Sequence, residues 1–184
     1  MQENPRIDAV ICGEGELVLQ ELLEAKYNGQ ALEEIPGLAV RYGKAVHITP
    51  ARPPLKDLDQ IPSPLPFMEI HRGLVYYETS RGCPFRCAYC LSACDSGVRY
   101  FSLERVKKDL LFLMQNQAKV VKFVDRSFNC HEKRARQIMD FILANNISTR
   151  FHMEINAELL SDEMLDYLSR VPKGVFDFEI GIQS

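Results

Sequence analysis

The chain has 184 residues, of which 46% are hydrophobic and 26% charged, and its formal net charge is −3. This composition is typical of a globular protein with one sizeable core and does not suggest a dedicated nucleic-acid binder. No apolar run reaches the roughly 18–20 residues of a membrane span, and the amino terminus lacks a signal-peptide pattern, so we expect a cytoplasmic protein without a membrane partner.

The first residues predict the tail of an α/β domain. Residues 7–12 (IDAVIC) favour a short buried strand, in which Cys12 is expected to be a buried structural thiol. A helix follows and is expected to end at Asn28-Gly29, where glycine suits the C-cap. One strand and one helix do not close a core, so residues 1–30 are interpreted as the end of a domain whose beginning is absent.

A hairpin and a proline-rich connector come next and occupy residues 31–73. Residues 38–48 alternate around Gly43, which predicts a small hairpin. The segment TPARPPLKDLDQIPSPLPF is then dense in proline, which fixes φ and lacks an amide donor. We expect an extended, semi-rigid linker here, and it is the best domain boundary in the chain.

From residue 74 to residue 184 predicted strands and helices alternate regularly. This order implies parallel strands joined by right-handed crossovers, in an open sheet or a barrel whose ligands gather at the carboxyl ends of the strands. The predicted fold class is α/β, with the first four strands of a partial (β/α) barrel preceded by the tail of an α/β domain. Because the chain stops after the fourth strand, it is interpreted as a fragment. The strands are expected at 74–80, 120–125, 149–155 and 175–182, and the helices at 102–117, 131–146 and 161–171.

Three cysteines follow the first of these strands, in the segment Cys83-Pro-Phe-Arg-Cys87-Ala-Tyr-Cys90. Three thiolates on a 4Fe–4S cluster leave one iron without a protein ligand. A closed zinc site needs a fourth ligand, for which Cys94 or His71 could be proposed, and a ferredoxin-like carrier also uses four. The spacing favours the open cluster, and a non-enzymatic, zinc-stabilised binding module stays as the alternative.

The motif C-x₃-C-x₂-C, with Tyr89 before its last cysteine, resembles the signature of the radical S-adenosylmethionine enzymes, and the resemblance covers most of residues 74–184. In that family the open iron binds the amino and carboxylate groups of S-adenosylmethionine, and the reduced cluster cleaves it to a 5′-deoxyadenosyl radical. The resemblance therefore implies two cofactors, a 4Fe–4S cluster and S-adenosylmethionine. It also implies a small-molecule substrate and a reducing partner such as flavodoxin or ferredoxin.

Further segments resemble the subgroup of this family that carries a cobalamin-binding domain before the barrel. They are DAVICGEGE at residues 8–16, SRGCPFRCAYCLSACDSGVR, KFVDRSFN and FEIGIQS. The subgroup includes anaerobic magnesium-protoporphyrin monomethyl ester oxidative cyclases, so the reaction is expected to be tetrapyrrole cyclase-like or methyltransferase-like. Cobalamin is expected only in a full-length protein, because the part that supplies a histidine to cobalt is absent here. A methylthiotransferase-like modifier of RNA or protein is the second enzyme hypothesis, although Cys12 alone does not provide that family's additional N-terminal cluster.

The resemblance also suggests the site residues. Cys83, Cys87 and Cys90 are the expected iron ligands, and no catalytic residue is assigned. Tyr89 is expected beside the adenine, and Asp125 at the amino group of S-adenosylmethionine unless it caps a helix or pairs with Arg126. The remaining cofactor-binding candidates lie at the ends of the third and fourth strands: Glu154, Asn156 and Gln183. The alternation in the third strand leaves open on which face of the sheet Glu154 lies.

Overall fold

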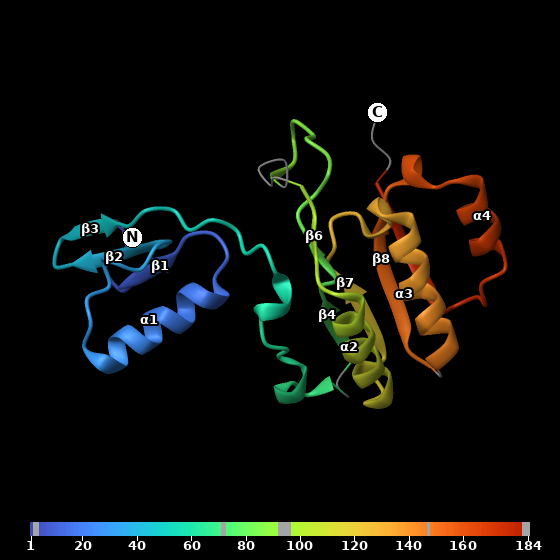
Figure 1. The fold of residues 1–184 in the computed structure, drawn as a ribbon, viewed down its shortest axis with the longest axis horizontal. Helices are drawn as coiled ribbons and strands as arrows, with labels where there is room; N and C mark the ends of the chain where they lie inside the picture. The colour runs from blue at the N-terminus through green and yellow to red at the C-terminus, as the bar shows by residue number, and fades with distance from the viewer. Residues whose placement is uncertain (2–3, 71–72, 92–96, 147, 182–184) are drawn as a thin grey trace. The chain divides into compact units, whose positions relative to one another are not determined.

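The computed structural model describes residues 1, 4–70, 73–91, 97–146 and 148–181 (Figure 1). The chain divides into two compact units, Met1–Lys56 and Asp57–Ser184. The first unit holds a three-stranded sheet, and the second holds a four-stranded and a two-stranded sheet. The division falls inside the proline-rich segment.

The first unit is a small antiparallel sheet with one helix. Its elements are β1 (Ala9–Ile11), α1 (Glu16–Asn28), β2 (Leu38–Tyr42) and β3 (Ala45–Ile48), and the strand order is β1-β2-β3. The predicted hairpin β2–β3 therefore shares a sheet with the first strand, because β2 pairs with β1. Gly29 ends the helix with φ of 65°, as the sequence indicated. The expected burial of Cys12 is wrong: it follows an edge strand and is exposed.

The second half of the proline-rich segment belongs to the second unit and is not simply extended. It forms the 3₁₀ turns η1 (Leu58–Gln60) and η2 (Leu65–Phe67). Apolar side chains between the prolines explain the difference, because their burial offsets the cost of folding the segment back on the unit. The buried side chains are Leu58, Ile61 and Leu65.

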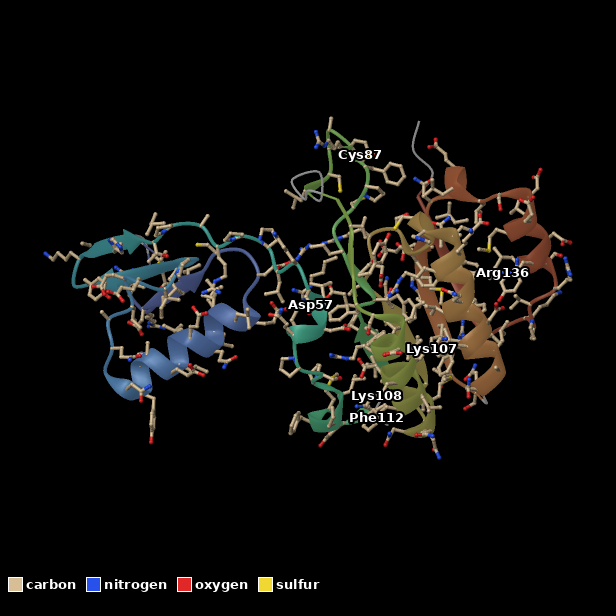
Figure 2. The ribbon with its side chains drawn as sticks, in the orientation of Figure 1. Asp57, Cys87, Lys107, Lys108, Phe112 and Arg136 are labelled. Atoms are coloured by element: carbon tan, nitrogen blue, oxygen red, sulfur yellow. The ribbon has the colours of Figure 1, made fainter. Side chains whose placement is uncertain are left out.

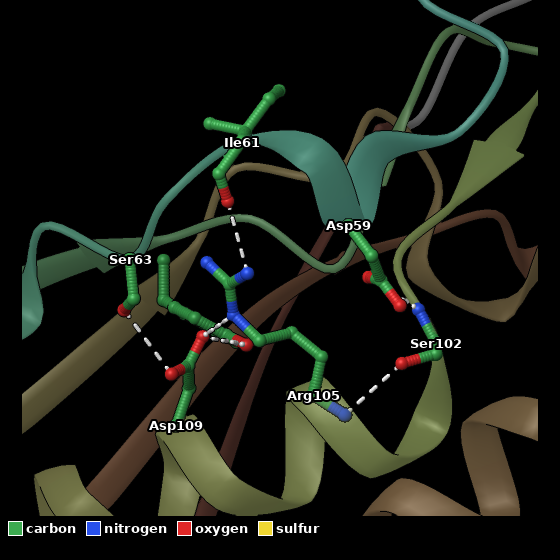
Figure 3. A network of polar contacts seen from close by, with 7 residues as sticks. Asp59, Ile61, Ser63, Ser102, Arg105 and Asp109 are labelled. Atoms are coloured by element: carbon green, nitrogen blue, oxygen red, sulfur yellow. Dashed lines mark hydrogen bonds and ion pairs between the residues drawn. The ribbon is translucent and has the colours of Figure 1, made fainter.

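A polar network fastens this segment to the helix α2 (Leu103–Gln115) (Figure 3). Arg105 donates to the carbonyl oxygen of Ile61 at 3.0 Å and pairs with Asp109 at 2.7 Å. Ser63 donates to the same carboxylate at 3.1 Å, and Asp59 accepts from the backbone of Ser102 at 3.0 Å. The connector is thus part of the wall of the second unit.

The second unit is built on a four-stranded parallel sheet in the order β4-β7-β8-β9. Strands and helices alternate as predicted, and this confirms the α/β fold class. Ser102 and Ser161 cap the helices α2 and α4, each accepting a backbone hydrogen bond at 3.1 Å. Short strands and 3₁₀ turns lie in the connections. The elements are β4 (Leu74–Tyr77), β5 (Ser80–Arg81), β6 (Arg99–Tyr100), β7 (Val120–Phe123), η5 (Phe128–Cys130), α3 (Glu132–Asn145), β8 (Arg150–Ile155), η6 (Ala157–Leu159), α4 (Asp162–Ser169) and β9 (Phe176–Ile180).

The core of the second unit lies between one face of the sheet and the helices. Side chains on this face are buried at alternate strand positions, as in Phe123 and Phe151, whose ring centroids are 6.2 Å apart. Helices α2 and α3 contact each other and supply apolar residues such as Leu110 and Ile138 (Figure 1). The opposite face carries exposed side chains, among them Tyr76. In the described part of the chain, no helix combines the length and apolarity needed to cross a membrane.

Candidate functional site

The cysteine loop lies where the parallel arrangement predicts a site, at the carboxyl end of β4 (Figure 2, where Cys87 marks the loop). Beyond the end of β4, the chain passes through Glu78 and Thr79 into β5, and it returns in β6, which pairs with β5 in antiparallel fashion. Ser80 lies opposite Tyr100 and Arg81 opposite Arg99. The cysteine loop, which connects β5 and β6, is therefore joined at its two ends by a short ladder.

None of the three predicted thiols forms a disulfide, and each is at least partly accessible. Cys83 and Cys87 are half-buried and Cys90 is exposed, and the amide of Cys90 donates to the carbonyl oxygen of Cys87 at 3.0 Å. Across the part of the chain that the structure describes, no three potential ligands lie close enough together to hold one metal ion. The donor set itself fits an iron–sulfur cluster, since thiol sulfurs are its usual protein ligands. Binding a cluster requires residues 83–90 to close around it.

Backbone packing at the base of the loop explains why residue 82 is a glycine. Gly82 has φ of 93°, and a Cβ atom there would lie 2.0 Å from the carbonyl oxygen of Gly97. No side chain fits at that distance, so the two ends of the loop approach as closely as they do because residue 82 is glycine. Gly97 also has positive φ, but a Cβ atom added to it would have no neighbour within 4 Å.

Asp125 follows β7 and holds the first end of the loop. Its side chain is only 1% exposed, and its carboxylate accepts from the Thr79 amide at 3.0 Å, the Thr79 hydroxyl at 2.6 Å and the Ser80 hydroxyl at 2.5 Å. Burial raises the pKa of Asp125, and these hydrogen bonds oppose the rise. The partners are thus Thr79 and Ser80, whereas the cofactor contact implied by the resemblance stays a prediction.

Glu154 lies on the sheet face that points away from the helices. Its neighbours Met153 and Ile155 are buried, whereas Glu154 itself is partly exposed. In register it pairs with Glu179 of β9, which accepts from Lys122 at 3.1 Å and lies 3.4 Å from the imidazole of His152. The hydrogen bond that Lys122 donates to Glu179 raises the pKa of Lys122. A charged patch therefore lies beside Glu154 on the face of the sheet that the helices do not cover. The contact of Glu154 with a cofactor stays a prediction.

The other predicted cofactor contacts have distinct surroundings. Asn156 follows β8 and exchanges two hydrogen bonds with Asn129, at 2.8 and 2.9 Å, while its side chain caps η6. Tyr89 is 71% exposed, and desolvation together with the nearby Cys87 raises its pKa. Gln183 lies outside the described residues, as do Cys94 and His71. Direct roles for Asn156 and Tyr89 at S-adenosylmethionine stay predictions.

Cys130 is a thiol near this site that the sequence did not single out. It is half-buried in η5, and its sulfur lies 3.2 Å from the hydroxyl of Tyr100 in β6. Burial raises the pKa of Cys130, and the nearby Cys83 contributes to the rise. The signal available in the sequence was its place after the second parallel strand, beside the loop that follows the first.

Comparison with known proteins fits this geometry. Residues 77–184, more than half of the chain, match the radical SAM superfamily. The chain belongs to that superfamily. The predicted cofactors, a 4Fe–4S cluster and S-adenosylmethionine, are those of radical SAM enzymes.

Relatives of the chain include methyltransferases and a cyclase. The chain is 38% identical to an uncharacterized methyltransferase of Pyrococcus horikoshii, over 75% of this chain and 32% of the relative. It is 30% identical to the cobalamin-dependent radical SAM methyltransferase TokK of Streptomyces tokunonensis, over 69% of this chain and 21% of TokK. It is 34% identical to an anaerobic magnesium-protoporphyrin IX monomethyl ester cyclase of Rubrivivax gelatinosus, over 49% of this chain and 18% of the cyclase. The relatives are thus of the kinds that the resemblance implied, and the chain spans about a third or less of each relative's length.

A solved structure supports the fold. The radical S-adenosylmethionine methyltransferase TsrM of Kitasatospora setae, with cobalamin and a 4Fe–4S cluster bound, aligns with a TM-score of 0.70. The alignment covers 95% of this chain and 38% of TsrM at 19% identity, so it shows a shared radical SAM fold.

Proposed function

We propose that this chain holds a 4Fe–4S cluster through Cys83, Cys87 and Cys90 and binds S-adenosylmethionine at the iron that these thiolates leave open. The observation that carries the proposal is the placement of three thiols, none of them in a disulfide, on one loop that is joined at its base, at the carboxyl edge of the parallel sheet. That edge is where ligands of parallel α/β sheets bind. A three-thiolate donor set leaves one position of the cluster available to a cofactor.

The chain's own residues supply the position and the surroundings of this centre. The β5–β6 ladder and the carboxylate of Asp125 keep the base of the loop in place while residues 83–90 close around the cluster. When bound, the cluster supplies the electron that cleaves S-adenosylmethionine to a 5′-deoxyadenosyl radical. The proposed contacts of the cofactor are three polar residues at or just after the carboxyl ends of β7 and β8: Asp125, Glu154 and Asn156.

For the reaction of the longer protein, we propose methyl transfer to a small molecule, with electrons from a flavodoxin-like or ferredoxin-like partner. The methyltransferase relatives align with 75% and 69% of this chain, compared with 49% for the cyclase. Their matches therefore extend further beyond the barrel segment. We also propose that residues 1–30 end a cobalamin-binding domain, so that cobalamin is a cofactor of the longer protein only.

Anaerobic reconstitution of the purified chain with iron and sulfide tests the proposal. We expect about four irons per chain and the broad visible absorbance of thiolate-to-iron charge transfer. A parallel sample receives Zn²⁺ instead, and we expect no tight tetrahedral complex with one zinc per chain. Stoichiometric tetrahedral zinc without any cluster would support the zinc-stabilised binding module and contradict the proposal.

A further inference from the structure

The connection between β7 and α3, together with the first turn of α3, contacts both ends of the cysteine loop. At the entering end, Asp125 accepts three hydrogen bonds from Thr79 and Ser80. Its side chain is almost completely buried, so these partners replace water as donors to the charge. Hydrogen bonds to a buried carboxylate are among the stronger ones in proteins.

At the returning end, the main contact comes from Arg134 in the first turns of α3. Its guanidinium donates to the carbonyl oxygen of Phe101 at 2.7 Å and to that of Thr79 at 3.4 Å. The same group lies over the ring of Tyr100, 4.9 Å from the centroid. One side chain therefore contacts the residues that precede the loop and the residues that follow it.

The two contacts act on neighbouring backbone segments. Thr79 meets both Asp125 and Arg134, and its carbonyl oxygen also accepts from the amide of Phe101 at 3.1 Å. Just beyond these residues, β5 and β6 pair for only two residues each. Because so short a ladder is weak by itself, its geometry depends on the groups that hold its ends.

We infer that Asp125 and Arg134 are positioning residues, which fix the separation and orientation of the two ends of the cysteine loop so that its three thiolates meet the cluster correctly. The inference rests on the proposed function. Fixing the ends of a loop lowers the entropy lost when the loop closes on its ligand. Neither residue needs to touch the cluster to have this effect.

The test uses variants that remove one hydrogen-bonding group each. Thr79→Val deletes the hydroxyl bound by Asp125 at nearly constant shape, and Thr79→Ser restores a hydroxyl. Arg134→Gln removes the guanidinium, and Arg136→Gln is its control on the same helix, where the side chain is 53% exposed. Asp125→Asn completes the series. Circular dichroism checks that each variant keeps the wild-type helix content.

Two measurements are made on each variant of the whole chain. Hydrogen exchange of the cluster-free protein reports on residues 79–81 and 99–101, with the strand 150–155 as the internal reference. We expect exchange at the loop ends to be about tenfold faster in Thr79→Val, Asp125→Asn and Arg134→Gln, and unchanged in the reference strand. Electron paramagnetic resonance of the reconstituted, reduced protein should show a broadened or shifted cluster signal in the same variants, and Thr79→Ser and Arg136→Gln should match the wild type.

The outcomes separate the inference from the proposed function. A wild-type protein that forms no cluster contradicts the proposed function, whatever the exchange rates are. A wild-type cluster whose signal is the same in all variants overturns the positioning inference and leaves the proposed function intact. Faster exchange without any change in the signal overturns it as well, because the two residues would then only stabilise the fold.

Discussion

Replacing Cys83, Cys87 or Cys90 by alanine should abolish the iron–sulfur absorbance after reconstitution, and each single replacement should suffice. Three thiolates are the full protein ligand set of the proposed centre, so the loss of one leaves two irons without a protein ligand. We expect bound iron to fall from about four per chain to near background. Iron and sulfide analysis of the reconstituted, desalted proteins measures the effect.

The matched controls for this series are the other cysteines. Cys12→Ala changes an exposed thiol in the first unit, and Cys130→Ala changes the thiol beside Tyr100. Both, together with Cys94→Ala, should retain wild-type iron. Loss of the cluster in Cys130→Ala or Cys94→Ala would mean that a fourth thiolate binds the cluster. The proposal that one iron has no protein ligand would then be wrong.

Substituting Gly82 by alanine should reduce cluster incorporation almost as much as losing a cysteine. The added Cβ would stand 2.0 Å from the carbonyl oxygen of Gly97, at a residue whose φ of 93° already disfavours a side chain. The clashing atom belongs to the backbone and cannot move away by a change of rotamer, as a side chain could. The two ends of the loop must therefore separate. We expect this separation of the loop ends, beyond the penalty for positive φ, to cause at least a roughly tenfold loss of cluster occupancy at limiting iron, which corresponds to about 1.4 kcal/mol or more.

Gly97→Ala is the control for that variant. Residue 97 also has positive φ, so it carries the same kind of conformational penalty, but nothing lies within 4 Å of an added Cβ. We expect most of the wild-type occupancy to remain. Equal losses in the two variants would show that glycine conformation alone, and not the close approach of the two loop ends, governs the site.

The sequence predicted the sheet and the loop but not the contacts that hold the loop. Regular alternation of apolar strands and amphipathic helices was sufficient for the parallel order, and the cysteine spacing was sufficient to propose the ligand set. The strands β5 and β6 are two residues long, which is too short for a periodic pattern. Their pairing across a loop of more than a dozen residues depends on tertiary contacts.

The contact of Asp125 with Thr79 and Ser80 could have been predicted from the sequence. Thr79 and Ser80 follow the first parallel strand, and Asp125 follows the second. Because neighbouring parallel strands end at the same edge, two hydroxyls and a carboxylate were bound to lie close together there. The resemblance pointed this carboxylate toward the cofactor, and the structure shows it bound to the base of the loop. Arg134 gave no such signal, since a basic residue at a helix start usually lies in solvent.

The proposed open iron is tested most directly by adding S-adenosylmethionine to the reconstituted and reduced protein and recording its electron paramagnetic resonance spectrum. If the cofactor's amino and carboxylate groups bind the iron that the three thiolates leave open, the g values of the cluster should shift, and methionine added alone as a control should not reproduce the full change. A cluster spectrum that stays the same at saturating S-adenosylmethionine would contradict an open coordination position at Cys83, Cys87 and Cys90.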